Sequence, residues 1–150
     1  YILFGIFAII FRMKITSLQN NKIKQVVRLR QRNERDETNL FLIEGYRELL
    51  RFSEKGNKPL ELFYCPELFL GSNENALIAK LSGPNTTLFE CSADVFKKIS
   101  YRDRPDGLLA IGKQVHLSLN DIKLPKDRSP FFVVAEAIEK PGNLGTILRS

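Results

Sequence analysis

The stretch Phe131-Phe-Val-Val-Ala-Glu-Ala-Ile-Glu-Lys-Pro-Gly-Asn-Leu-Gly-Thr-Ile-Leu-Arg-Ser150 carries the clearest structural signal in this chain of 150 residues. Its opening FFVVA is typical of a buried strand, and the segment Lys140–Gly145 has the proline and glycines of a turn. The apolar residues that follow predict the start of a helix. In α/β enzymes, a strand, a glycine-bearing loop and a helix start often hold an anionic or nucleotide group. We therefore expect the front part of an enzyme, truncated inside its first catalytic motif.

This turn has an ordinary interpretation as well, because many strands pass into helices through proline and glycine without binding anything. Gly142 and Gly145 allow positive φ or close backbone approach, and Asn143 can cap the next helix or face a ligand. The chain contains no GxGxxG and no Walker lysine pattern, so neither a dinucleotide site nor a P-loop is indicated.

Upstream, apolar runs alternate with amphipathic segments of roughly ten residues, which predicts an α/β layer fold. The first helix is expected from Asn20 onward, and Gln31–Asn39 is expected to be a loop. Strands are expected at 41–43, 60–65, 86–91 and 108–115, and further helices at 46–55, 73–81 and 93–99. The division that follows is a small α/β domain at 13–115, a linker at 116–130, and the first strand of a second domain from 131.

The N-terminal residues 1–11 are apolar and uncharged. They are too few to cross a bilayer, which takes about 20 residues, and no basic region or cleavage site of a signal peptide accompanies them. Because Met13 begins a sequence that reads sensibly by itself, we expect residues 1–12 to be an upstream extension. A membrane anchor is the alternative.

The net charge of +6 arises from one part of the chain. From Lys14 to Arg35 there are seven basic residues and one acid, whereas residues 36–150 carry fifteen basic and sixteen acidic ones. A basic surplus on one amphipathic stretch indicates a patch for a polyanion, and a solvated helix face is the equal alternative.

Cysteine and histidine are scarce, with only Cys65, Cys91 and His116 in the chain. No zinc site can be built from them here, so we expect no metal. Both cysteines lie in apolar runs, which predicts buried thiols and a reducing, cytoplasmic setting.

The segment VVAEAIEKPGNLGTILRS resembles the first signature motif of the SpoU (TrmH-type) RNA 2′-O-ribose methyltransferases, members of the knotted SPOUT superfamily. Lys140 stands where the common pattern has aspartate. Two upstream segments, FLIEGYRELL at 41–50 and RDRPDGLLA at 102–110, are similar to parts of that family's substrate-binding domain, which resembles ribosomal protein L30e. The motif positions are taken by Glu136, Pro141, Asn143, Gly145, Ile147 and Arg149.

The resemblance implies methyl transfer from S-adenosylmethionine to a ribose 2′-hydroxyl of RNA, with Arg149 activating the hydroxyl and Asn143 supporting the loop. A guanidinium, with a pKa above about 12, is a poor proton acceptor, so gripping the adjacent phosphate and stabilising the forming alkoxide are also part of the role. The family binds its cofactor in later motifs, so the cofactor-binding residues are expected beyond Ser150 and the chain alone is expected to be inactive.

The same resemblance makes RNA the expected partner, with ribosomal RNA favoured over transfer RNA, and a homodimer formed through the knotted domain. The alternative is a non-catalytic RNA-binding protein of the L30e type. The expected backbone contacts are Lys22, Lys24, Arg28, Arg30, Arg32 and Arg35, with Arg102 and Arg104 as a second set.

Overall fold

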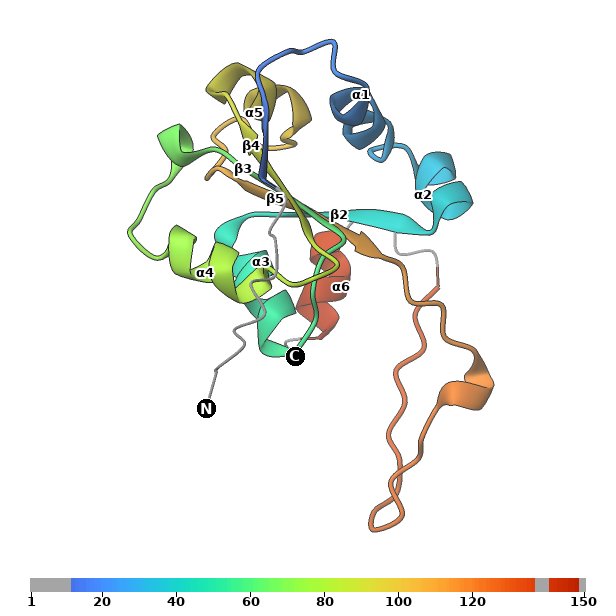
Figure 1. The fold of residues 1–150 in the computed structure, drawn as a ribbon. Coiled ribbons are helices and arrows are strands. Elements are labelled where there is room, and N and C mark those ends of the chain that lie inside the picture. Colours follow the sequence, from blue (N-terminus) through green and yellow to red (C-terminus); the bar gives the residue numbers. More distant parts are fainter. Residues whose placement is uncertain (1–11, 137–140, 149–150) are drawn as a thin grey trace, which may run out of the picture. The chain divides into compact units, whose positions relative to one another are not determined.

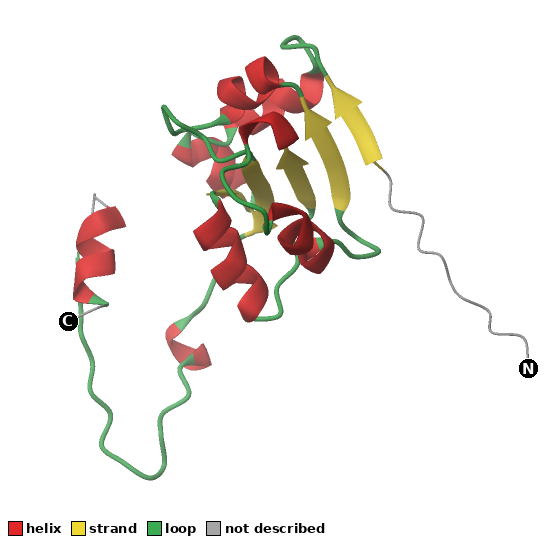
Figure 2. Cartoon of the chain, turned by 90° about the vertical axis from the view of Figure 1, so that its left-hand side faces the viewer, coloured by secondary structure: helices red, strands yellow, loops and turns green. Residues whose placement is uncertain are grey.

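The computed structural model describes residues 12–136 and 141–148. Its centre is a five-stranded sheet in the order β1-β4-β3-β5-β2 (Figure 2). Strands β1 and β3 both run parallel to β4, whereas β5 pairs antiparallel with β3 and with β2. The strands are β1 (Arg12–Ile15), β2 (Leu40–Glu44), β3 (Glu61–Tyr64), β4 (Thr87–Cys91) and β5 (Leu108–Lys113).

Helices cover both faces of this sheet, as Figure 1 shows, with α1 and α5 on one side and α3 and α4 on the other. The predicted α/β layer fold is therefore confirmed. Contacts divide the chain into two units after Val115. The helices of the first unit are α1 (Asn21–Arg28), α2 (Arg32–Thr38), α3 (Tyr46–Glu54), α4 (Glu74–Leu81) and α5 (Ala93–Ile99), with the short 3-10 turn η1 (Pro66–Leu68).

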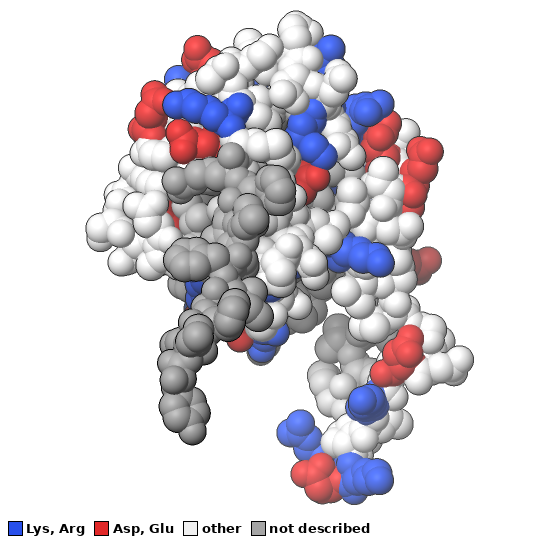
Figure 3. All heavy atoms as spheres, in the orientation of Figure 1, with Lys and Arg blue, Asp and Glu red and all other residues white. Residues whose placement is uncertain are grey.

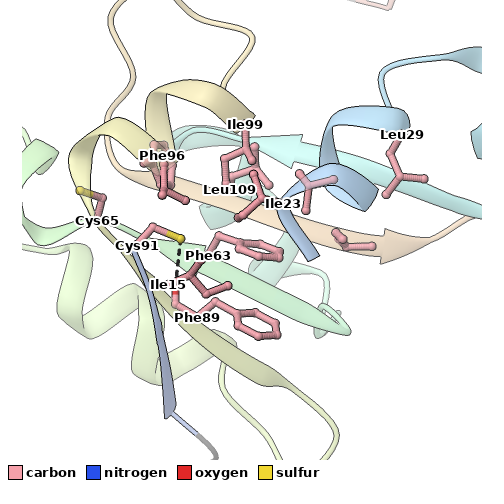
Figure 4. Close-up of a cluster of buried hydrophobic side chains, with 13 residues drawn as sticks. Ile15, Ile23, Leu29, Phe63, Cys65, Phe89, Cys91, Phe96, Ile99 and Leu109 are labelled. Atoms are coloured by element: carbon pink, nitrogen blue, oxygen red, sulfur yellow. Dashed lines mark hydrogen bonds between the residues drawn. The ribbon is translucent and has the colours of Figure 1, made fainter. Parts of the chain in front are cut away.

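The core lies on both sides of the sheet because side chains alternate along each strand. In β3, Phe63 packs with α1 and α5, whereas its neighbours Leu62 and Tyr64 pack with α3 and α4. Figure 4 shows the first of these clusters, in which the rings of Phe63 and Phe89 stack with centroids 4.8 Å apart. These two residues are register partners in the β3–β4 pair, so strand pairing and ring packing support one another.

The start of α1 follows the sequence expectation. Asn20 is its N-cap, and the Asn20 side chain accepts a hydrogen bond of 2.8 Å from the backbone N–H of Lys22. Ile23 and Val26, one helical turn apart, are fully buried, and they fix the face that α1 turns to the sheet.

The prediction of a loop at Gln31–Asn39 is wrong, because residues Arg32–Thr38 form helix α2. None of its residues is buried, so its sequence lacks the apolar periodicity from which a helix is predicted. The helix is supported by an Arg32–Asp36 ion pair of 3.4 Å one turn apart, and it ends at Asn39, whose φ of 56° is the left-handed conformation of a helix C-terminus.

Strand β1 was not predicted either. It is only four residues long and two of them are basic, so it has little of the apolar character that marks a buried strand. It holds the edge of the sheet by pairing Ile15 with Cys91 of β4. Arg12, the last residue of the expected extension, is the first residue of this strand, and residues 1–11 lie outside the described part.

In the second unit, the predicted strand at 131–135 is not formed, and these residues are exposed coil. A strand needs neighbouring strands for its N–H and C=O groups, and the described part of this unit contains none. The predicted turn is also displaced, because helix α6 (Pro141–Ile147) already begins at the proline. Proline suits the first helical position, where its missing N–H costs nothing.

The expected linker at 116–130 is largely coil and contains the short 3-10 turn η2 (Leu119–Asp121). Across residues 12–136 and 141–148, no helix has the length and apolar character needed to cross a bilayer.

Candidate functional site

Two of the segments that carried the family resemblance meet in the structure. Glu44 ends β2, and the loop from Ser100 to Gly107 precedes β5, the antiparallel neighbour of β2. The Glu44 carboxylate accepts hydrogen bonds from the Ser100 hydroxyl and, at 2.8 Å, from the backbone N–H of Tyr101. The carboxylate therefore holds the loop against the end of the strand.

Arg102 ties the same loop to the start of α3. Its guanidinium lies 3.0 Å from the carboxylate of Glu48 and 3.4 Å from that of Asp106, and it donates a 3.2 Å hydrogen bond to the Glu44 carbonyl. Asp106 in turn accepts a 2.8 Å hydrogen bond from the backbone N–H of Tyr46 and so caps α3. Arg102 is therefore engaged within the protein.

The glycines of the two segments are required by this junction. Gly45 has φ 107°, and a Cβ there would lie 2.5 Å from a guanidinium nitrogen of Arg102. Gly107 has φ 77°, and its Cβ would lie 2.6 Å from the carbonyl oxygen of Cys65. Other residues would meet both an unfavourable backbone conformation and a steric clash.

Beside this junction lies a cavity of about 460 Å³ between the starts of α3 and α4. Glu74, the first residue of α4, is 5% exposed, and its Oε1 accepts hydrogen bonds from the N–H groups of Leu70 and Gly71 at 3.2 and 2.7 Å. Its Oε2 is buried and has no hydrogen-bond partner among the described residues. The residues that line the cavity include Tyr46, Arg47, Leu70, Glu74, Arg102 and Asp106.

The cavity was not anticipated from the sequence. The only available signal was the turn Gly71-Ser-Asn followed by Glu74, which looks like an ordinary helix start. Its other walls come from α3 and from the loop before β5, which lie far from this turn in the sequence on either side. The sequence alone does not bring these segments together.

Three of the six basic residues predicted on the first helical stretch are engaged in the fold. Lys22 forms a 2.7 Å ion pair with Glu61. The guanidinium of Arg30 donates to the carbonyls of Lys98 and Ser100 at 2.8 and 2.6 Å. It also lies over the ring of Tyr101, 5.0 Å from the centroid.

Arg35 completes this group, since its guanidinium donates to the carbonyls of Leu29 and Arg30 at 3.1 and 2.7 Å. It thereby bonds carbonyl groups that follow the end of α1, a place where the last carbonyls of a helix lack intrahelical partners.

The other basic residues are available to solvent. Lys24, Arg28 and Arg104 are exposed, and no ion pair or hydrogen bond of their side chains occurs in the described part of the chain. Arg32 is 88% exposed, and its one ion pair with another described residue is with Asp36 of its own helix. On the face drawn in Figure 3, basic and acidic side chains of the first unit are interspersed rather than gathered in one patch.

Helix α5 carries two further exposed cations that the sequence analysis did not include among the expected RNA contacts. Lys97 and Lys98 are exposed in its last turn, and α5 packs beside α1. Exposed basic residues therefore lie on two packed helices that are widely separated in the sequence.

The two predicted catalytic residues receive no test from the geometry. Asn143 falls within α6, and its side chain lies outside the described part. Arg149 lies outside the described residues altogether. Their roles stay predictions.

The cysteines are buried and free, as predicted. Burial raises the pKa of the Cys65 thiol and raises that of the Cys91 thiol from 9.0 to about 12. Thiols of this kind are poor nucleophiles. Among the described residues, no group of three or more metal-ligating side chains occurs.

This three-layer domain is of a kind found in SpoU-type RNA methyltransferases. Its fold matches an RNA 2′-O ribose methyltransferase at 36% identity and a TM-score of 0.71, covering 91% of this chain and 50% of that one. It also matches the AdoMet-bound rRNA methyltransferase from Sinorhizobium meliloti at 29% identity and a TM-score of 0.63, covering 74% and 40%.

Residues 20–110 match the MRM3-like substrate binding domain, and the chain belongs to this family. An uncharacterized tRNA/rRNA methyltransferase of Synechocystis is 28% identical over 137 residues, which is 91% of this chain and 47% of that protein. The chain thus spans about half the length of the relatives that it matches. Because 137 aligned residues cannot fit within residues 1–115, the similarity extends into the second unit.

Proposed function

We propose that this chain is the N-terminal part of an S-adenosylmethionine-dependent RNA 2′-O-ribose methyltransferase, and that residues 13–115 are its L30e-like RNA-binding domain. The observation that carries the proposal is the family membership of residues 20–110 together with the Pro141-x-Asn-x-Gly segment that follows. The names of the matched proteins, an RNA 2′-O ribose methyltransferase and an AdoMet-bound rRNA methyltransferase, support the same chemistry.

S-adenosylmethionine would supply the methyl group, but the described residues do not offer a fitting site for it. Residues 131–136 are exposed coil, and no described strand flanks them to build a binding crevice. We therefore assign the cofactor to a later part of the full-length protein, through which a homodimer would also form.

In this proposal Arg149 grips the phosphate beside the target nucleotide and stabilises the developing alkoxide, while Asn143, at the start of α6, supports the active-site loop. Ribosomal RNA is the proposed substrate, and the cytoplasm the proposed location. The exposed basic residues supply salt-dependent contact with the RNA backbone rather than choice of sequence. These residues are Lys24, Arg28, Arg32 and Arg104, with Lys97 and Lys98 beside them.

The test is transfer of labelled methyl groups from S-adenosylmethionine to ribosomal RNA and to transfer RNA by the full-length protein. A product 2′-O-methyl group makes the neighbouring phosphodiester resistant to alkali, which identifies the position on the ribose. Arg149→Ala should lower the rate by at least about tenfold without loss of RNA binding. The matched control is Arg51→Ala, because Arg51 is exposed on α3 and, among the described residues, pairs only with Glu54.

Two results would contradict the proposal in different ways. Equal rates for the Arg149→Ala and Arg51→Ala proteins would remove the assigned role of Arg149. RNA binding without any methyl transfer by the wild-type protein would favour the alternative, a non-catalytic RNA-binding protein of the L30e type.

A further inference from the structure

Tyr101 carries a large aromatic side chain at the surface of the first unit. It opens the loop that joins α5 to β5, and 54% of its surface is exposed. Tyrosine is enriched at interfaces because its ring offers a flat apolar face while its hydroxyl stays hydrated. What distinguishes this tyrosine from an ordinary exposed side chain is the number of contacts that hold it in place.

The backbone around Tyr101 is fixed by hydrogen bonds on both sides. The N–H of Tyr101 donates to the Glu44 carboxylate at 2.8 Å, and the hydroxyl of the buried residue Ser100 bonds the same carboxylate. The Ser100 hydroxyl also accepts a 3.0 Å hydrogen bond from the N–H of Arg102. Because the backbone is ordered before any ligand arrives, a ligand that contacts the ring loses little affinity to ordering of the loop.

Arg30 supports the ring of Tyr101 from one side. Its guanidinium carbon lies 5.0 Å from the ring centroid, and its hydrogen bonds to the carbonyls of Lys98 and Ser100 keep it there. The accessible part of the ring therefore lies away from Arg30. A cation over one face draws the π electrons of the ring towards itself, which reduces the negative charge on the opposite face. That face is thus suited to stacking against a second π system.

Exposed cations flank Tyr101 along the chain. Lys97 and Lys98 precede it in the last turn of α5, and Arg104 follows it in the loop. A chain spans at most about 3.6 Å per residue, so the Cα atoms of Lys98 and Arg104 lie within about 11 Å of that of Tyr101. Asp103 supplies the one carboxylate between Lys97 and Arg104. The stretch keeps a surplus of positive charge, which attracts the phosphates of a nucleic acid.

We propose that Tyr101 is a stacking platform for one unstacked RNA base, with Arg30 behind its ring and the RNA backbone held by Lys97 and Lys98. Proteins bind single-stranded RNA in this manner, by stacking bases on aromatic side chains and attracting the phosphates with cations. Every base has a π face, so the platform distinguishes unstacked bases from paired ones rather than one base from another. The inference rests on the proposed RNA-binding function and adds to it a residue that contacts a base.

The decisive experiment measures, by fluorescence anisotropy, the affinity of the full-length protein for two end-labelled oligomers with the same number of phosphates. One is single-stranded oligouridylate, and the other is an abasic ribose-phosphate oligomer, which keeps the charge and lacks the bases. Wild-type protein should bind oligouridylate at least about fivefold more tightly, because stacking on an aromatic side chain stabilises the complex only where a base is present.

The protein-side change is Tyr101→Leu, which keeps an apolar side chain and removes the flat ring. The preference for oligouridylate should fall to less than about twofold, with an unchanged salt slope because no charge is lost. Tyr101→Phe keeps the ring and should keep the preference. Leu70→Ala, which shortens an 80% exposed apolar side chain in the loop before α4, is the matched control and should keep it also. Lys97→Ala should weaken both oligomers alike and lower the salt slope by about one.

A second measurement detects the stacking contact itself. An oligouridylate with 2-aminopurine at one position fluoresces less when that base stacks on an aromatic ring. Saturating wild-type protein and Tyr101→Phe should quench this fluorescence, and saturating Tyr101→Leu should not. A role of Tyr101 in the fold alone would not produce this difference, provided that the circular dichroism spectra of the three proteins agree.

Equal binding of oligouridylate and the abasic oligomer by the wild-type protein would overturn the inference even if Tyr101→Leu failed to fold. A preference or a quenching that survives Tyr101→Leu would place the base elsewhere and overturn it also. Base stacking is measured separately from methyl transfer. A protein that stacks a base on Tyr101 without transferring methyl groups would keep this site and reject the proposed methyltransferase function. Methyl transfer without stacking on Tyr101 would do the opposite.

Discussion

Arg28 and Arg30 are two residues apart in sequence, and the structure predicts opposite consequences for their removal. Arg28 is exposed, and its side chain forms no ion pair or hydrogen bond with the described residues. Arg30 is half-buried and donates to the carbonyls of Lys98 and Ser100, so it joins the end of α1 to the end of α5. Arg30→Ala should therefore destabilise the fold, whereas Arg28→Ala should alter RNA affinity.

The magnitude follows from the contacts that Arg30 makes. A hydrogen bond from a charged donor contributes about 1.5–3 kcal/mol where it is shielded from water. Of the two that Arg30 donates, only the 2.6 Å bond to Ser100 is partly buried. Contact with the ring of Tyr101 at 5.0 Å adds about 0.5–1 kcal/mol, and the buried Nε, which has no partner in the described residues, offsets part of the gain. We expect a loss of about 2–3 kcal/mol in the free energy of unfolding.

The assay is urea denaturation followed by far-ultraviolet circular dichroism, paired with RNA binding over a series of salt concentrations. Arg28→Ala should change stability by less than about 0.5 kcal/mol and reduce the slope of log affinity against log salt by about one. Arg30→Ala should lower the denaturation midpoint and leave that slope unchanged under folding conditions. The reasoning is refuted if Arg30→Ala is as stable as wild type, or if it lowers the salt slope while Arg28→Ala does not.

Two further predictions concern the junction and the core. Gly107→Ala should cost about 3 kcal/mol or more in urea denaturation, because its Cβ would lie 2.6 Å from a backbone carbonyl, whereas Gly56→Ala, at a similar φ of 75° but with nothing within 4 Å, should cost only about 1–2 kcal/mol; equal losses would contradict the clash. Burial raises the pKa of Cys91 from 9.0 to about 12, so the folded state keeps a proton that the unfolded state releases. The free energy of unfolding should then fall as pH rises from 9.0 towards about 12, and it should fall less steeply in Cys91→Ala. Parallel curves of unfolding free energy against pH for the two proteins would show that Cys91 is not the cause.

The sequence predicted those elements whose stabilisation is hydrophobic. Residues 93–99 form α5 as expected, because Val95, Phe96 and Ile99 repeat at helical spacing and all three are fully buried. Helix α2 was not predicted because none of its residues is buried, and its visible features are an exposed Arg32–Asp36 pair and a left-handed end at Asn39. Hydrophobic periodicity carries no information about such a helix.

The opposite error, the strand expected at 131–135, has a different cause. An apolar run such as FFVVA shows that a segment gains by burial, but a strand forms only where other strands offer hydrogen bonds. Phe131 is 90% exposed and Val134 94%, and no described strand lies in their unit. The local composition therefore indicated that this segment favours a strand, but it could not show whether neighbouring strands are present to pair with it.

For the candidate site, the sequence showed which residues are basic. It did not show which of them form ion pairs or hydrogen bonds within the protein. The charge pattern placed Lys22 and Arg30 in the same RNA-binding patch as Lys24 and Arg28. In the structure Lys22 is paired with Glu61, and Arg30 bonds the carbonyl of Lys98, partners that lie 39 and 68 residues away. No local pattern distinguishes a cation that holds the fold together from one that faces solvent.

The two segments that resemble the family's substrate-binding domain, at 41–50 and 102–110, also contain residues that hold the fold together. Glu44 holds the loop at Tyr101, Arg102 joins that loop to Glu48 and Asp106, and both glycines have a positive φ that other residues rarely adopt. These segments therefore form the junction that supports the cavity wall, and they leave few groups free to contact a ligand. Substitutions within them should act on RNA binding through stability, without the change in salt slope expected at exposed positions. Since each class of change has its own readout, the residues that hold the domain together can be separated experimentally from those that meet RNA.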